Sequence, residues 1–198
     1  LPDVGPVYSV SIIPTGGAGG YTMPLPEKDE IYNTKGQMLQ EITVSLGGRV
    51  AEEEIFDDIT TGASQDIKQA TAIAKSMITK FGMSERLGLI NYDNDSDEVF
   101  IGRSMAQTKN YSEEVAALID EEVKALVDGA YARCGEILTH RRRELDIVAE
   151  YLLRYENMDA KTFEQVFTDP ASLQAQLPAD GDGDSASDPW PEPGNGDA

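Results

Sequence analysis

The chain has 198 residues and a formal net charge of −20, because 36 Asp and Glu residues outnumber 16 Lys and Arg residues. This charge argues against a nucleic-acid backbone or an anionic membrane surface as a partner, since both would repel it. The sequence contains no apolar run long enough to cross a bilayer, and its one Cys cannot form an internal disulfide. The single His excludes any site in this chain that needs two imidazoles.

The two ends of the sequence carry information about its organisation. The chain begins Leu1-Pro2, without an initiator Met or a signal peptide, which we interpret as processing or, preferably, as a fragment of a longer protein. Residues 169–198 contain seven acidic residues and no Lys or Arg, and Asp, Gly, Ser and Pro dominate from Pro178 onward. This composition predicts a solvated, disordered tail over 169–198 and a folded domain over 1–168.

The first elements of the folded domain are predicted to be strands. Residues 7–13 alternate and are rich in β-branched side chains, so they indicate a strand that ends at Pro14. A Gly-rich turn over 15–20 and a returning strand over 20–25 would complete a hairpin or a small sheet. The glycine run lacks the Gly-Lys-Ser/Thr ending of a phosphate-binding loop.

The next two elements are predicted to be helices. Apolar spacing indicates one helix over 34–54, in which Gly47-Gly48 is costly and suggests either close packing or a kink. After a polar loop, a second helix is predicted to start with Ser64 as its N-cap, to run through Phe81 and to end at Gly82.

The middle of the chain has a mixed pattern. Ile90-Asn91-Tyr92 is predicted to form a short strand. The acidic run from Asp93 to Glu98 lacks the residue register of a calcium loop, so we interpret it as a solvated loop.

The C-terminal third is predicted to be a helical hairpin with a final helix packed against it. Ser112 is expected to cap a long helix, on whose apolar face Cys134 would be a packed thiol. His140, near the end of that helix, is a favourable cation for the helix dipole. A second helix follows, and Asp159 is expected to cap a short last one. The predicted fold class is therefore mainly α with a small N-terminal β-hairpin or sheet.

One acidic residue has a candidate chemical role. Asp66 follows a Gly-containing loop and falls in the first turn of the predicted helix from Ser64. A carboxylate in this position could simply compensate the helix dipole. Alternatively, it could be a ligand carboxylate that the start of the helix holds at a fixed angle.

Several segments, in the same order along about residues 1–168, resemble the FtsH family of ATP-dependent zinc metalloproteases. The matching segments are Val7–Pro14, Gly20–Pro26, Ser45–Glu52, Thr61–Ile67, Phe81–Ser84, Glu98–Arg103 and Ile119–Val123. The resemblance implies a truncated, mostly helical FtsH-like peptidase domain. Only the tail falls outside it.

This resemblance has implications for the parent protein. Family members carry an ATPase domain, which uses ATP and magnesium, and an N-terminal membrane anchor; neither a P-loop nor an anchor is present in this sequence. A homo-hexameric ring would degrade unfolded or membrane proteins at the cytoplasmic side of a cell membrane, with a bacterial parent. The N-terminal hairpin would either bind extended substrate through Gly20-Tyr21-Thr22 or only close the small sheet.

The resemblance also implies a zinc site. The family's zinc is held by two His of a His-Glu-x-x-His helix and by an Asp of a later helix, which Asp66 matches. The Glu of that motif takes a proton from the attacking water. The motif itself is absent from this sequence, so the chain holds one of three zinc ligands and no catalytic residue.

These observations lead to one main hypothesis and two alternatives. In the main hypothesis, the chain is the C-terminal part of an FtsH-like peptidase domain and is inactive alone. The first alternative is a non-proteolytic relative that acts in assembly of a mixed ring. The second is a free-standing helical interaction domain.

Overall fold

The structure is a computed structural model that describes residues 1–2, 4–14, 19–25, 32–56, 58–93 and 111–176. In chain order its elements are β1 (Val7–Ser11), β2 (Tyr21–Pro24), α1 (Lys35–Ser45), α2 (Gly47–Phe56), α3 (Ser64–Thr79), α4 (Glu113–His140), α5 (Arg142–Tyr155), β3 (Asn157–Asp159), α6 (Ala160–Thr168) and α7 (Pro170–Gln176). The predicted class, mainly helical with a small N-terminal sheet, is confirmed.

The sheet has three strands in the order β2-β1-β3, and both pairs are antiparallel. The predicted hairpin of β1 and β2 is confirmed, although β1 ends at Ser11. The sequence did not predict β3, which joins the sheet from the far end of the chain. The Ile12 N–H donates to the carbonyl of Glu156 over 3.0 Å and thereby anchors β1 next to this strand.

The predicted single helix over 34–54 is divided into α1 and α2 at Leu46. Thr34 begins α1 with a capping box, in which its side chain accepts from the Gln37 N–H and the Gln37 side chain accepts from the Thr34 N–H. A Cβ at Gly47 or Gly48 would meet no heavy atom within 4 Å. The glycine pair therefore marks a kink and not a close contact.

The start of α3 differs from the prediction. Ser64 is already the first helical residue, and the N-cap is Ala63, which has no side chain that could cap the helix. The predicted N-cap role of Ser64 is therefore wrong. The helix ends at Thr79 with Lys80 as its C-cap, two residues before the predicted end at Phe81. Gly82 does have the left-handed φ of 61° expected of a residue that terminates a helix, and the Met83 N–H donates to the Met77 carbonyl.

The predicted strand over residues 90–92 does not form. Instead, the Tyr92 N–H donates to the carbonyl of Thr79 over 2.8 Å, which fixes this segment to the end of α3. The predicted solvated loop from Asp93 to Glu98 lies, after Asp93, outside the described residues.

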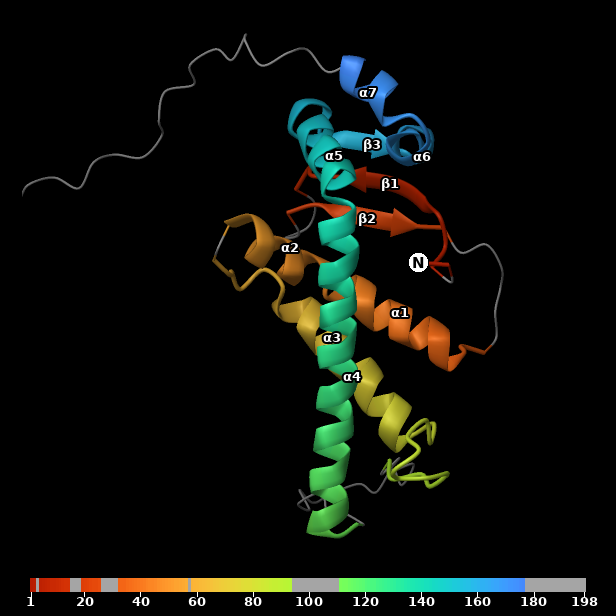
Figure 1. Cartoon of the computed structure of the whole chain (residues 1–198). Coiled ribbons are helices and arrows are strands. Elements are labelled where there is room, and N and C mark those ends of the chain that lie inside the picture. The colour runs from red at the N-terminus through yellow and green to blue at the C-terminus, as the bar shows by residue number, and fades with distance from the viewer. Residues whose placement is uncertain (3, 15–18, 26–31, 57, 94–110, 177–198) are drawn as a thin grey trace, which may run out of the picture.

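Helix α4 has 28 residues, and Ser112 caps it by accepting from the Val115 N–H over 3.3 Å, as predicted. Figure 1 shows that α5 continues almost in line with α4 beyond a break at Arg141, so these two helices do not form the expected hairpin. The chain reverses only after α5. None of the helices in the described ranges is both long enough and apolar enough to cross a membrane.

The chain after α5 packs back onto that helix. Asp159 caps α6 as predicted, because its carboxylate accepts from the Thr162 N–H over 2.8 Å. The folded part extends beyond Phe167, since residues 170–176 form α7 and Leu173 is buried. Residues 177–198 of the predicted tail lie outside the described residues.

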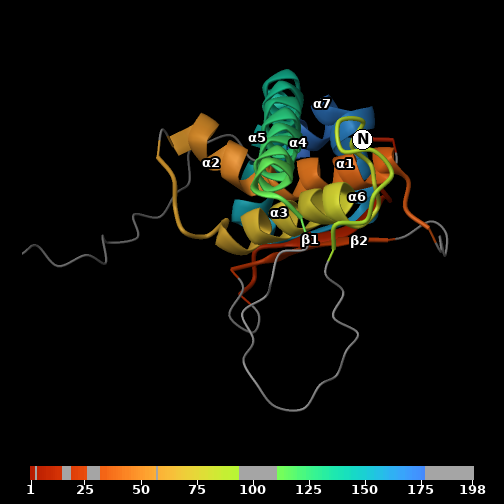
Figure 2. The same cartoon turned by 90° about the horizontal axis from the view of Figure 1, so that it is seen from below.

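The buried side chains form two separate groups among the described residues. One group fills the space between α1, α3, α4 and the segment after α3, and it contains Met38, Ile42, Leu46, Ala70, Ala74, Met77, Ile78, Leu87, Ile119 and Ala130. The other joins β3 to α5, α6 and α7 and contains Ile147, Leu152, Met158, Val166 and Leu173. Seen from below, α4 and α5 overlap in projection, with α1 and α3 beside them (Figure 2).

A buried serine links the segment after α3 to α4. The Ser84 hydroxyl donates to a carboxylate oxygen of Glu122 over 2.7 Å and accepts from the N–H of Leu87 over 3.2 Å. Arg86 donates to the second oxygen of Glu122 over 3.1 Å, so the carboxylate is fully engaged. Ser84 therefore couples a turn to a helix through one hydroxyl group.

We expect the substitution Ser84→Ala to lower the free energy of unfolding of the chain by about 1–3 kcal/mol, because the N–H of buried Leu87 would lose its acceptor. Urea unfolding followed by circular dichroism measures this loss. The matched control is Ser45→Ala. Among the described residues the Ser45 hydroxyl bonds only to the Glu41 carbonyl of its own helix, so its loss should change stability by less than about 0.5 kcal/mol. Equal effects of the two changes would contradict the expectation.

Candidate functional site

Asp66 is the third residue of α3 and lies in its first turn, where the helix dipole favours a negative charge. Its side chain is exposed, and no hydrogen bond or ion pair to another described residue engages its carboxylate. The dipole compensation and the ligand role that the sequence suggested are both compatible with this position. An exposed carboxylate with free oxygens is chemically suited to bind a cation.

The loop before Asp66 is fixed by a carboxylate of α2. One oxygen of Glu52 accepts from the Thr60 hydroxyl over 2.5 Å, and the other accepts from the Thr60 N–H over 3.1 Å. The Thr60 hydroxyl also accepts from the Gly62 N–H over 3.1 Å. Arg49, one turn earlier on α2, donates to the Thr60 carbonyl over 3.2 Å. Every polar atom of Thr60 is therefore used to hold the loop.

The electrostatics agree with this arrangement. The hydrogen bond from the Thr60 hydroxyl is the main reason that the pKa of Glu52 lies below its ordinary value, and the Thr60 N–H and the charge of Arg49 act in the same direction. The ionised form of Glu52 is the form that accepts both bonds. Glu52 therefore stays charged at neutral pH.

The described residues do not complete a metal site around Asp66. Within the ranges that the structure describes, no group of three or more His, Cys, Asp or Glu side chains could hold a metal ion. His140 ends α4, as predicted, and its Nδ1 lies 2.6 Å from the Glu136 carbonyl. Asp66 fits a zinc site as a single oxygen ligand, and any further ligands would have to come from outside the described residues.

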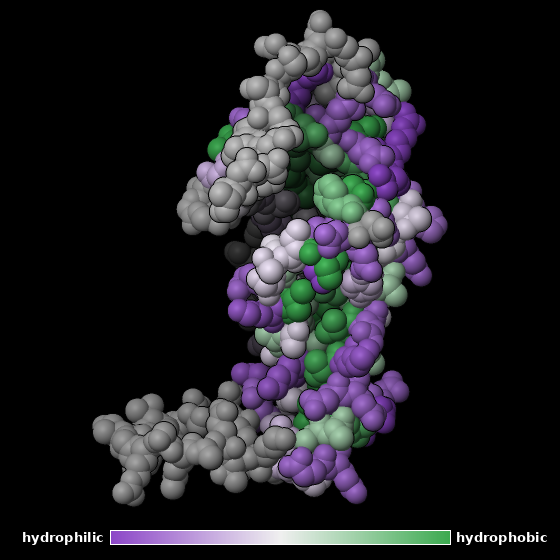
Figure 3. Space-filling model, turned by 90° about the vertical axis from the view of Figure 1, so that its left-hand side faces the viewer, coloured by the Kyte–Doolittle hydropathy of each residue, from purple (hydrophilic) through white to green (hydrophobic). Residues whose placement is uncertain are grey.

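Apolar side chains are exposed on β2 and around the end of α2. Tyr21 and Met23 on β2 are 43% and 46% exposed, and β2 is an edge strand. Ile55, Phe56 and Ile59, at the end of α2 and in the loop that follows, are also exposed. The space-filling view of the side on which α2 lies shows hydrophobic residues gathered between hydrophilic margins (Figure 3). Exposed apolar groups beside an unpaired strand edge are suited to bind extended polypeptide.

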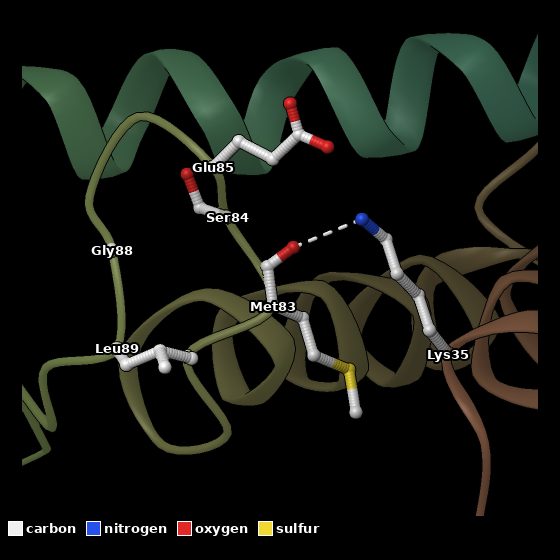
Figure 4. A pocket seen from close by; sticks show the side chains of 7 residues that line it. Lys35, Met83, Ser84, Glu85, Gly88 and Leu89 are labelled. Carbon is white, nitrogen blue, oxygen red and sulfur yellow. Dashed lines mark hydrogen bonds between the residues drawn. The ribbon is translucent and has the colours of Figure 1, made fainter.

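A separate pocket of about 390 Å³ lies between the start of α1 and the turn after α3. Lys35, Met83, Ser84 and Leu89 line it, and the Lys35 ammonium donates to the Met83 carbonyl over 3.0 Å (Figure 4). Lys35 and Glu85 are the charged side chains among its lining residues, which include no His or Cys. This residue set does not resemble a catalytic or metal-binding arrangement.

The one cysteine of the sequence is a packed core residue. Cys134 is 5% exposed on the inner face of α4, as the sequence predicted. Burial raises the pKa of its thiol, and the charge of Glu54 raises it further. A neutral, buried thiol is a poor nucleophile.

The sequence identified Asp66 but not the residues that hold the loop before it. Glu52 and Thr60 are eight residues apart and belong to a helix and a loop, so no local periodicity relates them. Glu52 lies within a segment that resembles the FtsH family, but the resemblance gave it no role. Only the fold shows that the two residues meet.

Comparisons with known proteins show which family the sequence resembles. Residues 1–166 match Peptidase family M41. The ATP-dependent zinc metalloprotease FtsH 1 of Thermoanaerobacter sp. is 50% identical over 167 residues, which cover 84% of this chain and 27% of that protein. The FtsH proteins of Ruminiclostridium cellulolyticum and Mycobacterium bovis are 49% and 43% identical and have 26% and 22% of their lengths covered.

The chain thus spans about a quarter of the length of these relatives. The match nevertheless extends through nearly all of the described fold, from before β1 into α6. It includes the loop fixed by Glu52 and the first turn of α3 with Asp66. The chain belongs to peptidase family M41.

Proposed function

We propose that this chain is part of an ATP-dependent zinc endopeptidase and that Asp66 is a ligand of its zinc ion. The observation that carries the proposal is the exposed carboxylate of Asp66 at the start of α3, which no described residue engages. It lies in a chain that is 50% identical, over 167 residues, to an ATP-dependent zinc metalloprotease. When bound, zinc would polarise a substrate carbonyl and activate a water molecule. The remaining ligands and the general base would come from outside residues 1–198, because this sequence has only one His and lacks the His-Glu-x-x-His motif.

The whole protein would act on unfolded or membrane proteins. It would use ATP and magnesium in an ATPase domain, assemble as a hexamer and sit at the cytoplasmic side of a bacterial membrane. The names of the relatives support ATP-dependent proteolysis for those proteins. The edge strand β2 and its exposed apolar side chains support an extended polypeptide as the substrate.

The zinc content of the full-length protein tests the proposal directly. After dialysis against a metal-free buffer, the wild-type protein should retain about one zinc ion per subunit, and the Asp66→Ala protein should lose it. Equal zinc contents of the two proteins would refute the ligand role of Asp66. A zinc-free wild-type protein would instead favour a non-proteolytic relative.

We expect the 198-residue chain alone to show no sub-micromolar zinc binding. One carboxylate supplies too few ligands for a tetrahedral site. Isothermal titration calorimetry with zinc chloride measures this, and Asp66→Ala should leave the weak residual heat unchanged. Sub-micromolar binding that depends on Asp66 would contradict the expectation.

The outer edge of β2 gives a further prediction about substrate binding. The Leu25 N–H donates inward to the Pro6 carbonyl, so by the alternation of a strand the Thr22 N–H points outward. Thr22→Pro removes this outward donor and leaves the bonds to β1 in place. In the full-length protease we expect a several-fold higher KM for unfolded casein and unchanged ATP hydrolysis.

The control for this substitution is Thr22→Val, which keeps the backbone N–H and the β-branched shape. It should have the KM of the wild type. An unchanged KM for Thr22→Pro would show that β2 only closes the sheet.

A further inference from the structure

The first turn of α3 is positioned by the loop that precedes the helix. Its N-cap, Ala63, has no polar side chain, and among the described residues no side chain caps the first N–H groups of the helix. The Ser64 N–H donates instead to the Thr61 carbonyl in the preceding loop, over 3.1 Å. After the buried Ala63, the next residue of α3 that is buried in the core is Ala70. The six residues between them, including Asp66, are all exposed.

The preceding loop is in turn held by α2. Both oxygens of Glu52 accept from Thr60, and the Thr60 hydroxyl accepts from the Gly62 N–H. A Cβ at Gly62 would lie 3.1 Å from the Thr60 hydroxyl, which shows how closely the loop folds over this residue. A chain of contacts thus runs from Glu52 through Thr60 and Gly62 to the residues at which α3 begins. Figure 1 shows the loop joining the end of α2 to the start of α3.

We propose that Glu52 is a positioning residue, which fixes the direction of the Asp66 carboxylate by holding Thr60 and thereby the loop that starts α3. The proposal rests on the ligand role of Asp66 under the proposed function. It assigns Glu52 no contact with the metal, because both of its oxygens are occupied by Thr60. Bonds from a threonine to an ionised carboxylate are charge-assisted and roughly twice as strong as neutral ones. The loss of Glu52 should therefore loosen the loop although Arg49 also donates to the Thr60 carbonyl.

The first experiment measures the loop itself in the 198-residue chain. Amide hydrogen exchange of Thr60, Gly62 and Ser64 should become about tenfold faster in Glu52→Ala. The Thr60 N–H would lose its acceptor, and the acceptors of the other two amides, the Thr60 hydroxyl and the Thr61 carbonyl, would no longer be held in place. Thr60→Val should speed the exchange of Gly62 and Ser64 similarly, and Thr60→Ser, which keeps the hydroxyl, should not. Amides of the α3 core such as Met77 should be unchanged in all three variants.

The matched control is Glu54→Ala. Glu54 also lies on α2 and accepts one hydrogen bond, but its donor is the hydroxyl of Thr139 on α4. Its loss should leave the exchange of the loop amides unaltered. Equal exchange in Glu52→Ala and wild type, or equal acceleration by Glu54→Ala, would overturn the proposal.

The second experiment links the loop to the metal in the full-length protein. Thr60→Val should raise the Kd for zinc, measured by competition with a chromogenic chelator, about tenfold, as loss of groups that orient a ligand does in metal sites. Thr60→Ser and Glu54→Ala should keep the Kd of the wild type. If Glu52 were itself a ligand, Glu52→Ala would weaken zinc binding and Thr60→Val would not, which would overturn the positioning role.

The Asp66→Ala protein separates this proposal from the proposed function. If Asp66→Ala leaves the Kd for zinc unchanged, the ligand role fails, and with it the inference that the loop serves the metal. If Asp66→Ala abolishes tight binding but Thr60→Val and Glu52→Ala change neither exchange nor Kd, the proposed function stands and the positioning role of Glu52 is refuted.

Discussion

The Asp66→Ala variant of the full-length protein is expected to lose protein degradation almost completely while it continues to hydrolyse ATP. Loss of groups that only support a metal ligand costs about 10- to 100-fold in activity, so loss of the ligand itself should cost at least the upper value. ATP hydrolysis should persist, because Asp66 is an exposed residue of the peptidase fold and this chain contains no phosphate-binding loop. Casein degradation and phosphate release, measured on the same preparation, give the two rates.

The control for this experiment is Gln65→Ala. Gln65 precedes Asp66 in the same exposed turn, so its loss tests whether any change at the start of α3 impairs the enzyme. Both activities should remain at the wild-type level. Retained proteolysis in Asp66→Ala, or loss of both activities in it, would contradict the assigned role.

The Gly20→Ala variant of the chain is expected to lose its β1–β2 hairpin. A Cβ at Gly20 would lie 2.4 Å from the Ser11 carbonyl oxygen and 3.1 Å from the Ile12 Cα. Both are backbone atoms, so relief of the overlap requires the two strands to separate. We expect a loss of about 2–4 kcal/mol in the free energy of unfolding, in the range of backbone strain combined with lost strand pairing. Urea unfolding followed by circular dichroism measures it.

The neighbouring glycine provides the matched control. A Cβ at Gly19 would meet no heavy atom within 4 Å, so Gly19→Ala should change stability by less than about 0.5 kcal/mol. Both variants alter the same turn by one methyl group. Similar losses in the two would show that the turn tolerates no alanine at all, and the specific clash at Gly20 would then not be the cause.

The sequence predicted those elements whose signals are local. Ser112 and Asp159 were identified as helix caps because a capping side chain acts within three residues of its own position. The hairpin of β1 and β2 follows from alternation within a short segment. In contrast, β3 has three residues with one buried side chain, Met158, and exists only because β1 provides its partner.

The candidate site shows the same difference between features with a local sequence signal and features that depend on distant residues. Asp66 was identified from a short segment that resembles the FtsH family, and the structure confirms its place in the first turn of α3. Its ligand role stays a prediction. The predicted N-cap at Ser64 was wrong. The loop held by Glu52 places Ala63 at the N-cap position, so the helix already begins at Ser64, although Ser64 has the better capping side chain. Helix α7 was missed because Leu173 is its one buried residue, and the Pro, Ala, Ser and Gln residues around it give no apolar periodicity.

The separation of the two groups of buried side chains has a consequence for cooperativity. No described residue belongs to both groups, and the helices that carry them meet mainly where α4 passes into α5 at Arg141. Cooperative unfolding requires that loss of one core exposes or loosens the other. We therefore expect the sheet with α5, α6 and α7 to be able to lose its packing while α1, α3 and α4 keep theirs. Asp66 and β2 belong to different halves of the molecule in this respect.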